Sequence, residues 1–250
     1  MLPDVQPQET ERVLLMANNS TVLVIEDEAD LADVLRYNFE RQGYVCKCVH
    51  DGRDALTEVA RHPPDVVILD RLLPGLSGDE LISRLRQDPK TAAMPILLLT
   101  AKAEESDELV GFALGADDYV TKPFSMKVLM ARVDALLRRA STPPDSQSDT
   151  YVTGPVALDR SRREVRVDDR IVALTATEFE ILWALAAAKG RILTRARLIQ
   201  QALGACAVVS DRTIDVHVVA LRKKLGHAAG LIHTVRGAGY ALRAQPTEEK

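Results

Sequence analysis

Short apolar runs alternate with segments of helical periodicity through the first 140 residues. The runs are typical of buried strands, because each is a continuous apolar stretch bounded by polar residues. They occupy residues 21–27, 44–49, 65–70, 94–100 and 117–121. Apolar residues recur at helical spacing in residues 30–43, 52–62, 77–88, 106–115 and 125–140. Five strands alternating with five helices predict an α/β fold with a doubly wound parallel sheet, whose two faces are covered by the connecting helices.

The second half of the chain has a different pattern, in which strands come first and helices follow. Alternating segments at residues 156–159, 163–167 and 170–174 predict a small antiparallel sheet. Three helical segments come next, at residues 175–190, 194–204 and 210–226. The half closes at residues 232–242 with two short strands around a glycine-rich turn. We therefore expect an α+β domain after the α/β domain.

Composition sets the boundaries of these domains. Residues 141–150 are rich in Pro, Ser and Asp and have no apolar periodicity, so they are expected to form a linker. Residues 1–20 lack the basic start and apolar core of a secretory signal. Their Pro, Gln and Glu content predicts a disordered arm, with translation from Met16 as an alternative. The predicted domains are residues 21–140 and 151–243, followed by a tail at residues 244–250.

Charge is divided unevenly between the two halves. The net charge is −4, but residues 1–140 carry 16 Lys and Arg against 24 Asp and Glu, whereas residues 141–250 carry 16 against 12. A basic second half makes nucleic acid a candidate partner. No apolar run approaches the roughly 18 residues of a membrane span. The three cysteines, of which Cys46 and Cys48 share one face of a predicted strand, form no redox motif, so we expect reduced thiols and a cytoplasmic location.

Acidic side chains follow two of the predicted buried strands. Glu26 and Asp27 end the first strand, and Asp70 ends the third. The carboxyl ends of parallel strands meet at one edge of the sheet, where Thr100 and Lys122 also fall. Clustered carboxylates raise one another's pKa unless a cation such as Mg²⁺ or a lysine ammonium compensates them. Two acids for a metal, one nucleophilic acid, a hydroxyl and an ammonium are suited to accepting a phosphoryl group on a carboxylate. The alternative is a set of unrelated, solvated loop acids.

Across residues 21–140 the sequence resembles the receiver domain of two-component response regulators, through IEDE, VILDRLLPGLSG, LLLTA and GADDYVTKPF. The resemblance implies a flavodoxin-like receiver in which Asp70 accepts a phosphoryl group from a sensor histidine kinase. It also implies that Mg²⁺ is bound by Glu26, Asp27, Asp70 and the backbone carbonyl of Leu72.

The same resemblance assigns roles to the later strand ends. It implies that Thr100 and Lys122 contact the phosphoryl oxygens. Tyr119 would be a switch aromatic whose rotamer follows Thr100, although it could instead be an ordinary strand aromatic in the core. The Lys122–Pro123 bond is expected to be cis.

The helical segment at residues 210–226 has a basic face. At helical spacing Ile214, Val218, Leu221 and Leu225 form one stripe, which is expected to face the core. Basic residues on the other side suit phosphate contacts, and small apolar residues between them suit thymine methyl groups. That side and its flanks carry Arg212, Thr213, Val216, His217, Val219, Ala220, Arg222, Lys223 and Lys224. The alternative is a surface helix that happens to be basic.

Residues 151–243 resemble the winged helix-turn-helix effector domain of the OmpR/PhoB subfamily, through TEFEILWALAAAKGRILTRARL, the basic helix and TVRGAGY. The resemblance implies that the basic helix enters the major groove of double-stranded promoter DNA. The wing would contribute Thr234 and Arg236, with Gly237 and Gly239 permitting its tight turn.

The effector half also departs from its relatives. Val219 and Ala220 stand where better-known relatives often have arginines, so a different base preference is expected. The turn GACAVVSD lacks the acidic and aromatic residues with which some relatives reach RNA polymerase, which leaves that contact open.

The resemblance further implies a homodimer of phosphorylated receivers, formed through the fourth helix, fifth strand and fifth helix. The charged positions of that interface are matched by Asp117, Asp118, Arg132 and Arg139. The positions where opposite charges usually pair are held by Glu108, Ala113, Val128 and Asp134, so an altered dimer affinity is expected.

Together these features predict a phosphorylation-dependent, DNA-binding transcriptional regulator, with no enzyme activity beyond its own phosphorylation and dephosphorylation at Asp70. One alternative keeps the DNA-binding domain but makes the receiver a phosphorylation-independent dimer module. The other is a Mg²⁺-dependent phosphohydrolase with an aspartyl nucleophile. Such enzymes place the nucleophile in a D-x-D pattern after the first strand, whereas Asp70 follows the third.

Overall fold

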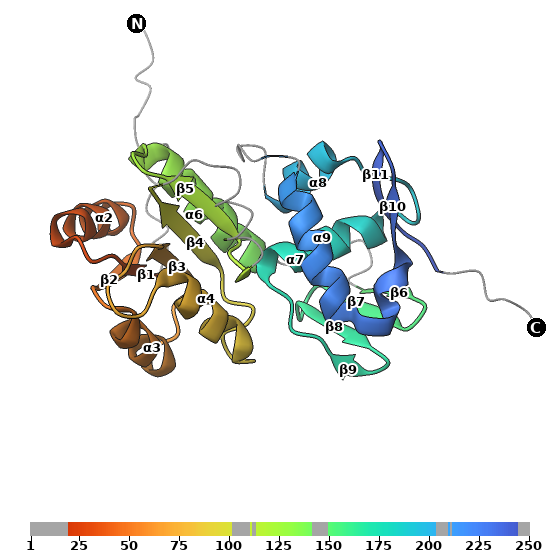
Figure 1. The fold of residues 1–250 in the computed structure, drawn as a ribbon, viewed down its shortest axis with the longest axis horizontal. Helices are drawn as coiled ribbons and strands as arrows, with labels where there is room; N and C mark the ends of the chain where they lie inside the picture. The colour runs from red at the N-terminus through yellow and green to blue at the C-terminus, as the bar shows by residue number, and fades with distance from the viewer. Residues whose placement is uncertain are drawn as a thin grey trace, which may run out of the picture.

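The computed structural model describes residues 20–101, 111, 114–141, 150–203, 210 and 212–244. Its first domain, the receiver (residues 20–141), contains a five-stranded sheet in the order β2-β1-β3-β4-β5, with all strand pairs parallel (Figure 1). The strands are β1 (Thr21–Ile25), β2 (Val45–Val49), β3 (Val66–Asp70), β4 (Ile96–Thr100) and β5 (Asp118–Thr121). The predicted doubly wound parallel sheet is confirmed. Because β1 lies between β2 and β3, ligands are expected beyond the carboxyl ends of β1 and β3.

Helices cover both faces of this sheet because side chains alternate along each strand. The receiver helices with complete bounds are α2 (Ala29–Arg41), α3 (Gly52–Arg61), α4 (Gly78–Gln87) and α6 (Met126–Ser141). α2 and α6 pack on the face that carries Val24 and Ile68. α3 and α4 pack on the face that carries Leu23 and Leu69. The two apolar clusters hold the carboxyl ends of the strands in fixed register.

The second domain, the effector domain (residues 150–244), begins with an antiparallel sheet of β6 (Thr150–Thr153), β7 (Val156–Asp159), β8 (Glu164–Val167) and β9 (Arg170–Ile171). Its helices are α7 (Ala176–Ala187), α8 (Arg195–Ala202) and α9 (Arg212–Leu225), followed by the 3₁₀ turn η1 (Gly226–Leu231). A hairpin of β10 (Ile232–Val235) and β11 (Gly239–Leu242) closes the domain. The predicted α+β winged helix is confirmed.

Trp183 is the one tryptophan of the sequence and lies in the core of the effector domain. The rings of Tyr151 and Phe179 pack against it with centroids at 4.7 and 6.1 Å. The guanidinium of Arg160 lies 5.1 Å from its ring centroid. Tryptophan fluorescence therefore reports on the effector domain alone.

α7 begins with a reciprocal cap. The Thr175 hydroxyl accepts from the Glu178 backbone N–H at 3.3 Å, and the Glu178 carboxylate accepts from the Thr175 N–H at 2.8 Å. This box satisfies the Glu178 donor of the first turn, in which backbone N–H groups lack partners within the helix. The N–H of Thr177, in the same turn, finds its acceptor in the receiver.

Several expected segments lie wholly or largely outside the described residues. They are the arm at 1–20, most of the helix at 106–115, the linker at 141–150 apart from its ends, most of the turn at 204–211 with Cys206, and the tail at 244–250 apart from its first residue. Among the helices that the structure describes, none is both long and apolar enough to cross a membrane.

Candidate functional site

Three carboxylates and an ammonium meet beyond the carboxyl ends of the strands. Glu26 and Asp27 follow β1, Asp70 ends β3, and Lys122 follows β5. The Nζ of Lys122 donates to Glu26 Oε2 at 2.8 Å and to Asp70 Oδ2 at 2.5 Å. One carboxylate oxygen from each of Glu26, Asp27 and Asp70 lies within 4.8 Å of the others. The structure thus brings these four residues together, as their strand-end positions predict.

Burial makes the electrostatics of this cluster unusual. Glu26 is fully buried, and this burial, reinforced by the charge of Asp70, raises the pKa of Glu26 to about 7 in spite of Lys122. Burial also acts to lower the pKa of Lys122, but the hydrogen bonds to Asp70 and Glu26 outweigh it and raise that pKa. One ammonium therefore leaves the cluster short of positive charge. A hard divalent cation with oxygen ligands fits this donor set, because it would favour the ionised form of Glu26.

The loop after β3 holds the Asp70 carboxylate in place. The backbone N–H of Leu72 donates to Asp70 Oδ1 at 2.8 Å. Arg71 forms a two-pronged ion pair with Asp79 at the start of α4, with Nε–Oδ1 and Nη2–Oδ2 distances of 3.0 Å. Gly78 lies so close that a Cβ there would be 2.7 Å from the Asp70 carbonyl oxygen. The acceptor loop, meaning the residues that follow Asp70, is therefore held against the start of α4 by the Arg71–Asp79 ion pair and by the close packing at Gly78.

Thr100 and Tyr119 are buried beside this edge. Thr100, at the end of β4, is 4 % exposed, and Tyr119, in β5, is 7 % exposed. The ring of Tyr119 belongs to the apolar cluster beneath α3 and α4, which is the packing expected of a core aromatic. Its role as a switch and the Leu72 carbonyl as a metal ligand stay predictions. The Lys122–Pro123 peptide bond is cis, as expected.

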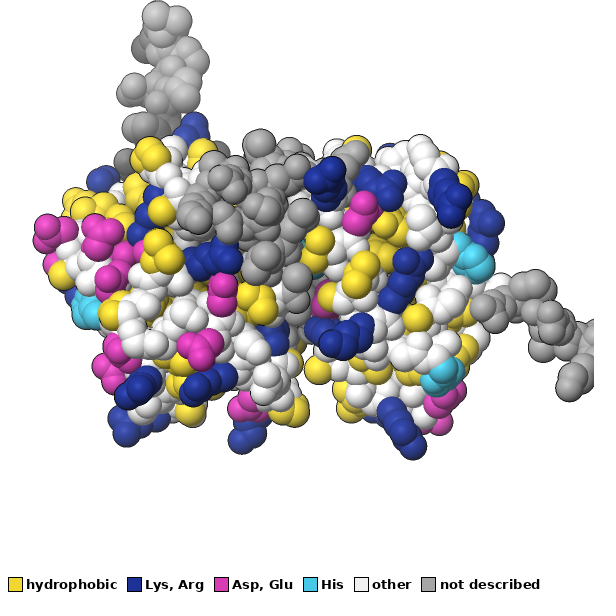
Figure 2. Space-filling model, in the orientation of Figure 1, with side chains coloured by type: hydrophobic (Ala, Val, Ile, Leu, Met, Phe, Trp, Pro, Cys, Tyr) yellow, Lys and Arg dark blue, Asp and Glu magenta, His cyan; other side chains and the backbone are white. Residues whose placement is uncertain are grey.

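The apolar stripe of α9 faces the effector core as predicted. Ile214, Val218, Leu221 and Leu225 are each 1 % exposed or less and belong to one cluster with α7 and α8. The other side of α9 presents Arg212, Lys223 and the 66 % exposed Val219 to solvent. Figure 2 shows Lys and Arg side chains spread over this face of the effector domain.

The wing is fastened to α9 by Arg222. Its Nη2 donates to the Ile232 carbonyl at 2.6 Å and to the Thr234 hydroxyl at 2.8 Å. Arg236 at the wing tip is exposed, and Gly237 and Gly239 have φ of 73° and 142°, as the expected tight turn requires. Arg222 and Thr234 thus hold the hairpin against the helix, which leaves Arg236 as the exposed wing cation in the described part of the hairpin.

Two expected DNA contacts are not on the surface. Thr213 and His217 are each 1 % exposed, so the expectation that they lie on an outward face or its flank is wrong for this state of the chain. Val216 and Ala220 are half-buried. Lys224 is held by Glu178, with an Nζ–Oε2 distance of 2.6 Å. The period of a helix identifies which side of α9 faces the core of its own domain. It does not show which of the neighbouring positions other parts of the chain cover.

The four residues expected at the dimer interface are also buried within the chain. Asp118 pairs with Arg132 of the same receiver at 2.7 Å, and burial raises the pKa of Asp118 in spite of that partner. Asp117 is fully buried and pairs with Arg86 at 2.9 Å. Arg139 is 9 % exposed and contacts the effector domain. Their part in a dimer stays a prediction.

Sequence reasoning missed a second set of residues that positions α9. The Tyr240 hydroxyl of β11 and Arg195 Nε of α8 both donate to Asp215 Oδ1, at 2.5 and 2.7 Å. The guanidinium of Arg195 lies 5.1 Å from the Tyr240 ring centroid. The basic start of α8 is visible in the motif TRAR, but no sequence spacing links these three residues.

Comparison with known families divides the chain as its structure does. Residues 22–134 match the family model described as "Response regulator receiver domain". Residues 169–242 match the model described as "Transcriptional regulatory protein, C terminal". The two matches fall on the parallel sheet and on the winged helix.

Similar proteins cover almost the whole chain. The phosphate regulon transcriptional regulatory protein PhoB of Rhizobium meliloti is 45 % identical over 225 residues, covering 89 % of this chain and 98 % of that protein. The sensory transduction protein RegX3 of Mycolicibacterium smegmatis is 42 % identical over 228 residues, covering 89 % and 99 %. Among solved structures, a point mutant of the protein RitR superimposes with a TM-score of 0.74 over 91 % of this chain and 100 % of that chain, and its 24 % identity shows the fold alone.

Proposed function

Since this chain is a two-component response regulator of the OmpR/PhoB type, we propose that a sensor histidine kinase phosphorylates Asp70 and thereby controls promoter binding by α9 and the wing. The chain is a phosphorylation-dependent transcription regulator. The observation that supports phosphorylation at Asp70 is the bridge from Lys122 to Asp70 and Glu26, within a cluster of three carboxylates at the strand ends.

The acceptor chemistry follows from the geometry at Asp70. A carboxylate oxygen of Asp70 attacks the phosphorus of the kinase's phosphohistidine, and the P–N bond breaks with its electron pair returning to nitrogen. Lys122 already donates to Asp70, so its ammonium is placed to neutralise charge on the transferred oxygens. The Thr100 hydroxyl donates to a phosphoryl oxygen. Glu26, Asp27, Asp70 and the Leu72 carbonyl would hold Mg²⁺, which supplies the missing positive charge when bound.

The output of the chain is DNA binding by a homodimer. Residues 21–140 serve as the receiver and residues 151–243 as the effector domain. The exposed cations Arg212, Lys223 and Arg236 suit phosphate contacts on either side of the groove. Val219 and Ala220 offer apolar contacts instead of hydrogen bonds to base edges, so the DNA sequence preferred here differs from that of relatives with arginines at these positions. A contact with RNA polymerase through the turn before α9 stays open.

Selection of bound fragments from the source organism's own DNA tests this function. Purified full chain with Mg²⁺ is compared with and without beryllofluoride, beside an Asp70→Ala control. We expect one motif to be enriched only with beryllofluoride and only with Asp70 intact. Enrichment of the same motif in every condition would refute the phosphorylation switch and favour the phosphorylation-independent regulator.

A direct measurement isolates the acceptor step. Intact-mass analysis after incubation with acetyl phosphate and Mg²⁺ should show one added phosphoryl group on the wild type and none on Asp70→Asn. Lys122→Met keeps an unbranched side chain, one atom shorter, and removes its charge, and we expect this variant to accept the phosphoryl group far more slowly. An Asp70→Asn chain that is still modified would show that the acceptor lies elsewhere.

A further inference from the structure

A cavity of about 360 Å³ lies in the effector domain between α7, α8 and the turn after β7. Glu180, Trp183 and three alanines form its wall on the α7 side, where the short alanine side chains leave room. Three arginines also line it, namely Arg160 after β7, Arg191 before α8 and Arg197 in α8. A volume of this size is typical of sites that bind small molecules.

The cavity is short of negative charge. Glu180 is the one acid among the described residues that line it, against three guanidinium groups. Its carboxylate lies 3.8 Å from Nη2 of Arg160 and 3.9 Å from Nη1 of Arg163, which is beyond hydrogen-bond distance. Burial raises the pKa of Glu180 in spite of Arg160, Arg163 and Arg139. Glu180 therefore compensates only part of the positive charge around the cavity.

The arginines that line the cavity have N–H donors available for a ligand. Within the described part of the chain, the side chains of Arg160 and Arg197 make no hydrogen bond, and Arg191 uses only Nε, which donates to the Ala188 carbonyl at 3.1 Å. A guanidinium presents its donors as a planar fork that fits two oxygens of an acidic group. The Arg160 side chain is 28 % exposed, whereas Arg191 and Arg197 are exposed, so water screens the charge of Arg160 least.

The α7 side of the cavity is apolar and aromatic. The guanidinium of Arg160 lies 5.1 Å from the centroid of the Trp183 ring, so a cation and an aromatic ring adjoin at one place. Tyr151 and Phe179 pack on the same tryptophan and hold it in position. An inorganic anion would use the arginines alone. An anion that carries an apolar ring matches both kinds of surface.

We propose that this cavity binds a small organic anion, an aromatic or cyclic carboxylate or sulfonate. Its acidic group lies against Arg160 and Arg197, and its ring lies against Trp183 and the alanines of α7. None of the exposed cations of α9 and the wing lines the cavity, so the site is separate from the proposed DNA surface. α7 and α8 share one apolar cluster with α9, so a bound anion acts on the domain that binds DNA. That link to transcription rests on the proposed function, but binding of the anion does not.

Two probes with the same ring system test the site in the full chain. Anilinonaphthalene sulfonate carries an acidic group, and its neutral parent, phenylnaphthylamine, does not. Because Trp183 is the one tryptophan of the sequence, energy transfer from it to each probe gives a dissociation constant for binding near the effector core. Circular dichroism shows which variants fold.

Four variants locate the binding site. Arg160→Met and Arg197→Met each remove one cation from the cavity, and Glu180→Gln removes its acid. Arg170→Met removes an exposed cation of β9, outside the cavity, and is the matched control.

We expect one sulfonate to bind per chain, and the neutral amine to bind at least about tenfold more weakly, because a hydrogen bond to a charged group changes an equilibrium by about that factor. Arg160→Met should weaken sulfonate binding by a similar factor, and Arg197→Met by less because its side chain is exposed. Arg170→Met should leave the dissociation constant unchanged. Glu180→Gln should bind the sulfonate at least as tightly as the wild type, which general damage to the domain would not allow.

Equal affinities for the two probes, or for the wild type and a folded Arg160→Met chain, would overturn the proposed site. If Arg160→Met does not fold, unchanged binding by Arg197→Met or weaker binding by Glu180→Gln would overturn it instead. Displacement of the sulfonate by duplex DNA would show that these arginines are phosphate contacts. If the beryllofluoride-treated wild type selects no DNA, the proposed function fails, while the dissociation constants of the probes still decide the anion site.

Discussion

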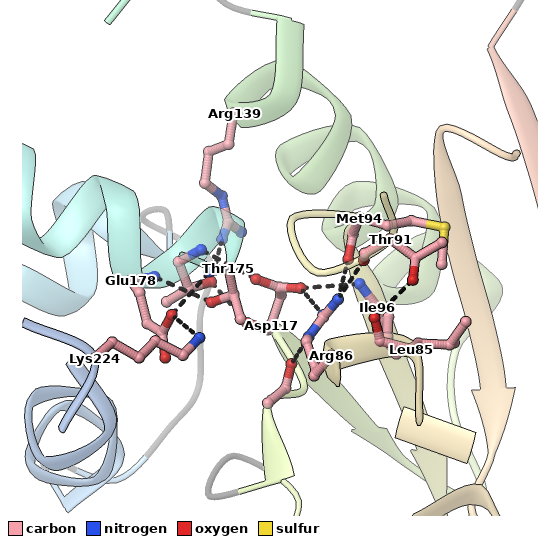
Figure 3. Close-up of polar contacts among 12 residues, drawn as sticks. Leu85, Arg86, Thr91, Met94, Ile96, Asp117, Arg139, Thr175, Glu178 and Lys224 are labelled. Atoms are coloured by element: carbon pink, nitrogen blue, oxygen red, sulfur yellow. Dashed lines mark hydrogen bonds and ion pairs between the residues drawn. The ribbon is translucent and has the colours of Figure 1, made fainter. Parts of the chain in front are cut away.

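Replacing Arg86 with Met should strongly destabilise the receiver. The Arg86 side chain is 8 % exposed and donates to three backbone carbonyls as well as to Asp117. The carbonyls belong to Gly115, Thr91 and Met94, at 2.8, 3.2 and 2.7 Å. Methionine fills a similar volume and satisfies none of these acceptors, so the segments before β4 and β5 lose their common partner (Figure 3).

The magnitude follows from the charge that remains. Asp117 is fully buried, and once the guanidinium has gone its carboxylate keeps only the backbone N–H donors of Ile96 and Thr177. Removing one partner of a buried ion pair costs about 3–5 kcal/mol, because the other charge is left uncompensated. Neutralising that charge as well should recover at least about 1 kcal/mol, so the double variant Arg86→Met/Asp117→Asn is expected to be more stable than Arg86→Met alone.

Urea denaturation of the full chain measures this loss. Far-UV circular dichroism follows both domains, while emission from Trp183 follows the effector domain and controls for damage there. We expect the part of the dichroism transition that comes from the receiver to move to lower urea concentration. The tryptophan transition, which comes from the effector domain, should move much less. A loss below about 1 kcal/mol, or a double variant less stable than Arg86→Met, would refute the reasoning that a buried, paired charge holds these segments together.

Three further predictions concern the acceptor loop, the wing and the buried histidine. Gly78→Ala should lower stability by about 1–3 kcal/mol and slow phosphorylation, because its Cβ would lie 2.7 Å from the Asp70 carbonyl; normal phosphorylation by intact mass would contradict this. Gly239→Ala should weaken DNA binding more than Gly237→Ala, because its Cβ would lie 2.0 Å from the Leu193 carbonyl oxygen whereas nothing lies within 4 Å of the other; equal affinities in a binding titration would contradict it. His217 is buried, which lowers its pKa to about 4 with help from Arg139 and Lys224 and against Asp117. Burial of the neutral imidazole stabilises the folded chain fully above the ordinary histidine pKa of about 6.5. The free energy of unfolding therefore falls by about 2 kcal/mol from pH 7 to pH 5, because the unfolded chain takes up the proton more readily than the folded chain. In urea titrations at these two pH values, His217→Gln should lose less stability than the wild type.

Much of the acceptor site can be predicted because strand ends leave a clear sequence signal. Apolar runs that stop abruptly at Glu26 and Asp70 identify two strand ends, and the geometry of a parallel sheet then brings them together. The core stripe of α9 can be predicted for the same reason, since Ile214 and Val218 follow the period of a helix.

The contact between the domains leaves no such signal. Asp117 and Thr177 are 60 residues apart, and neither position differs in type from an ordinary cap or turn residue. The burial of His217 cannot be found from periodicity, because the partner that covers this side of α9 belongs to another domain. Periodicity predicts which face of an element is apolar, but it does not identify the polar surfaces on which two domains meet.

The hydrogen bond between Asp117 and Thr177 joins two domains of one chain, so its formation is unimolecular and does not depend on protein concentration. A contact between two chains is bimolecular, and its occupancy rises with concentration by mass action. Dilution therefore leaves the receiver and the effector domain in contact, whereas it separates any pair of chains.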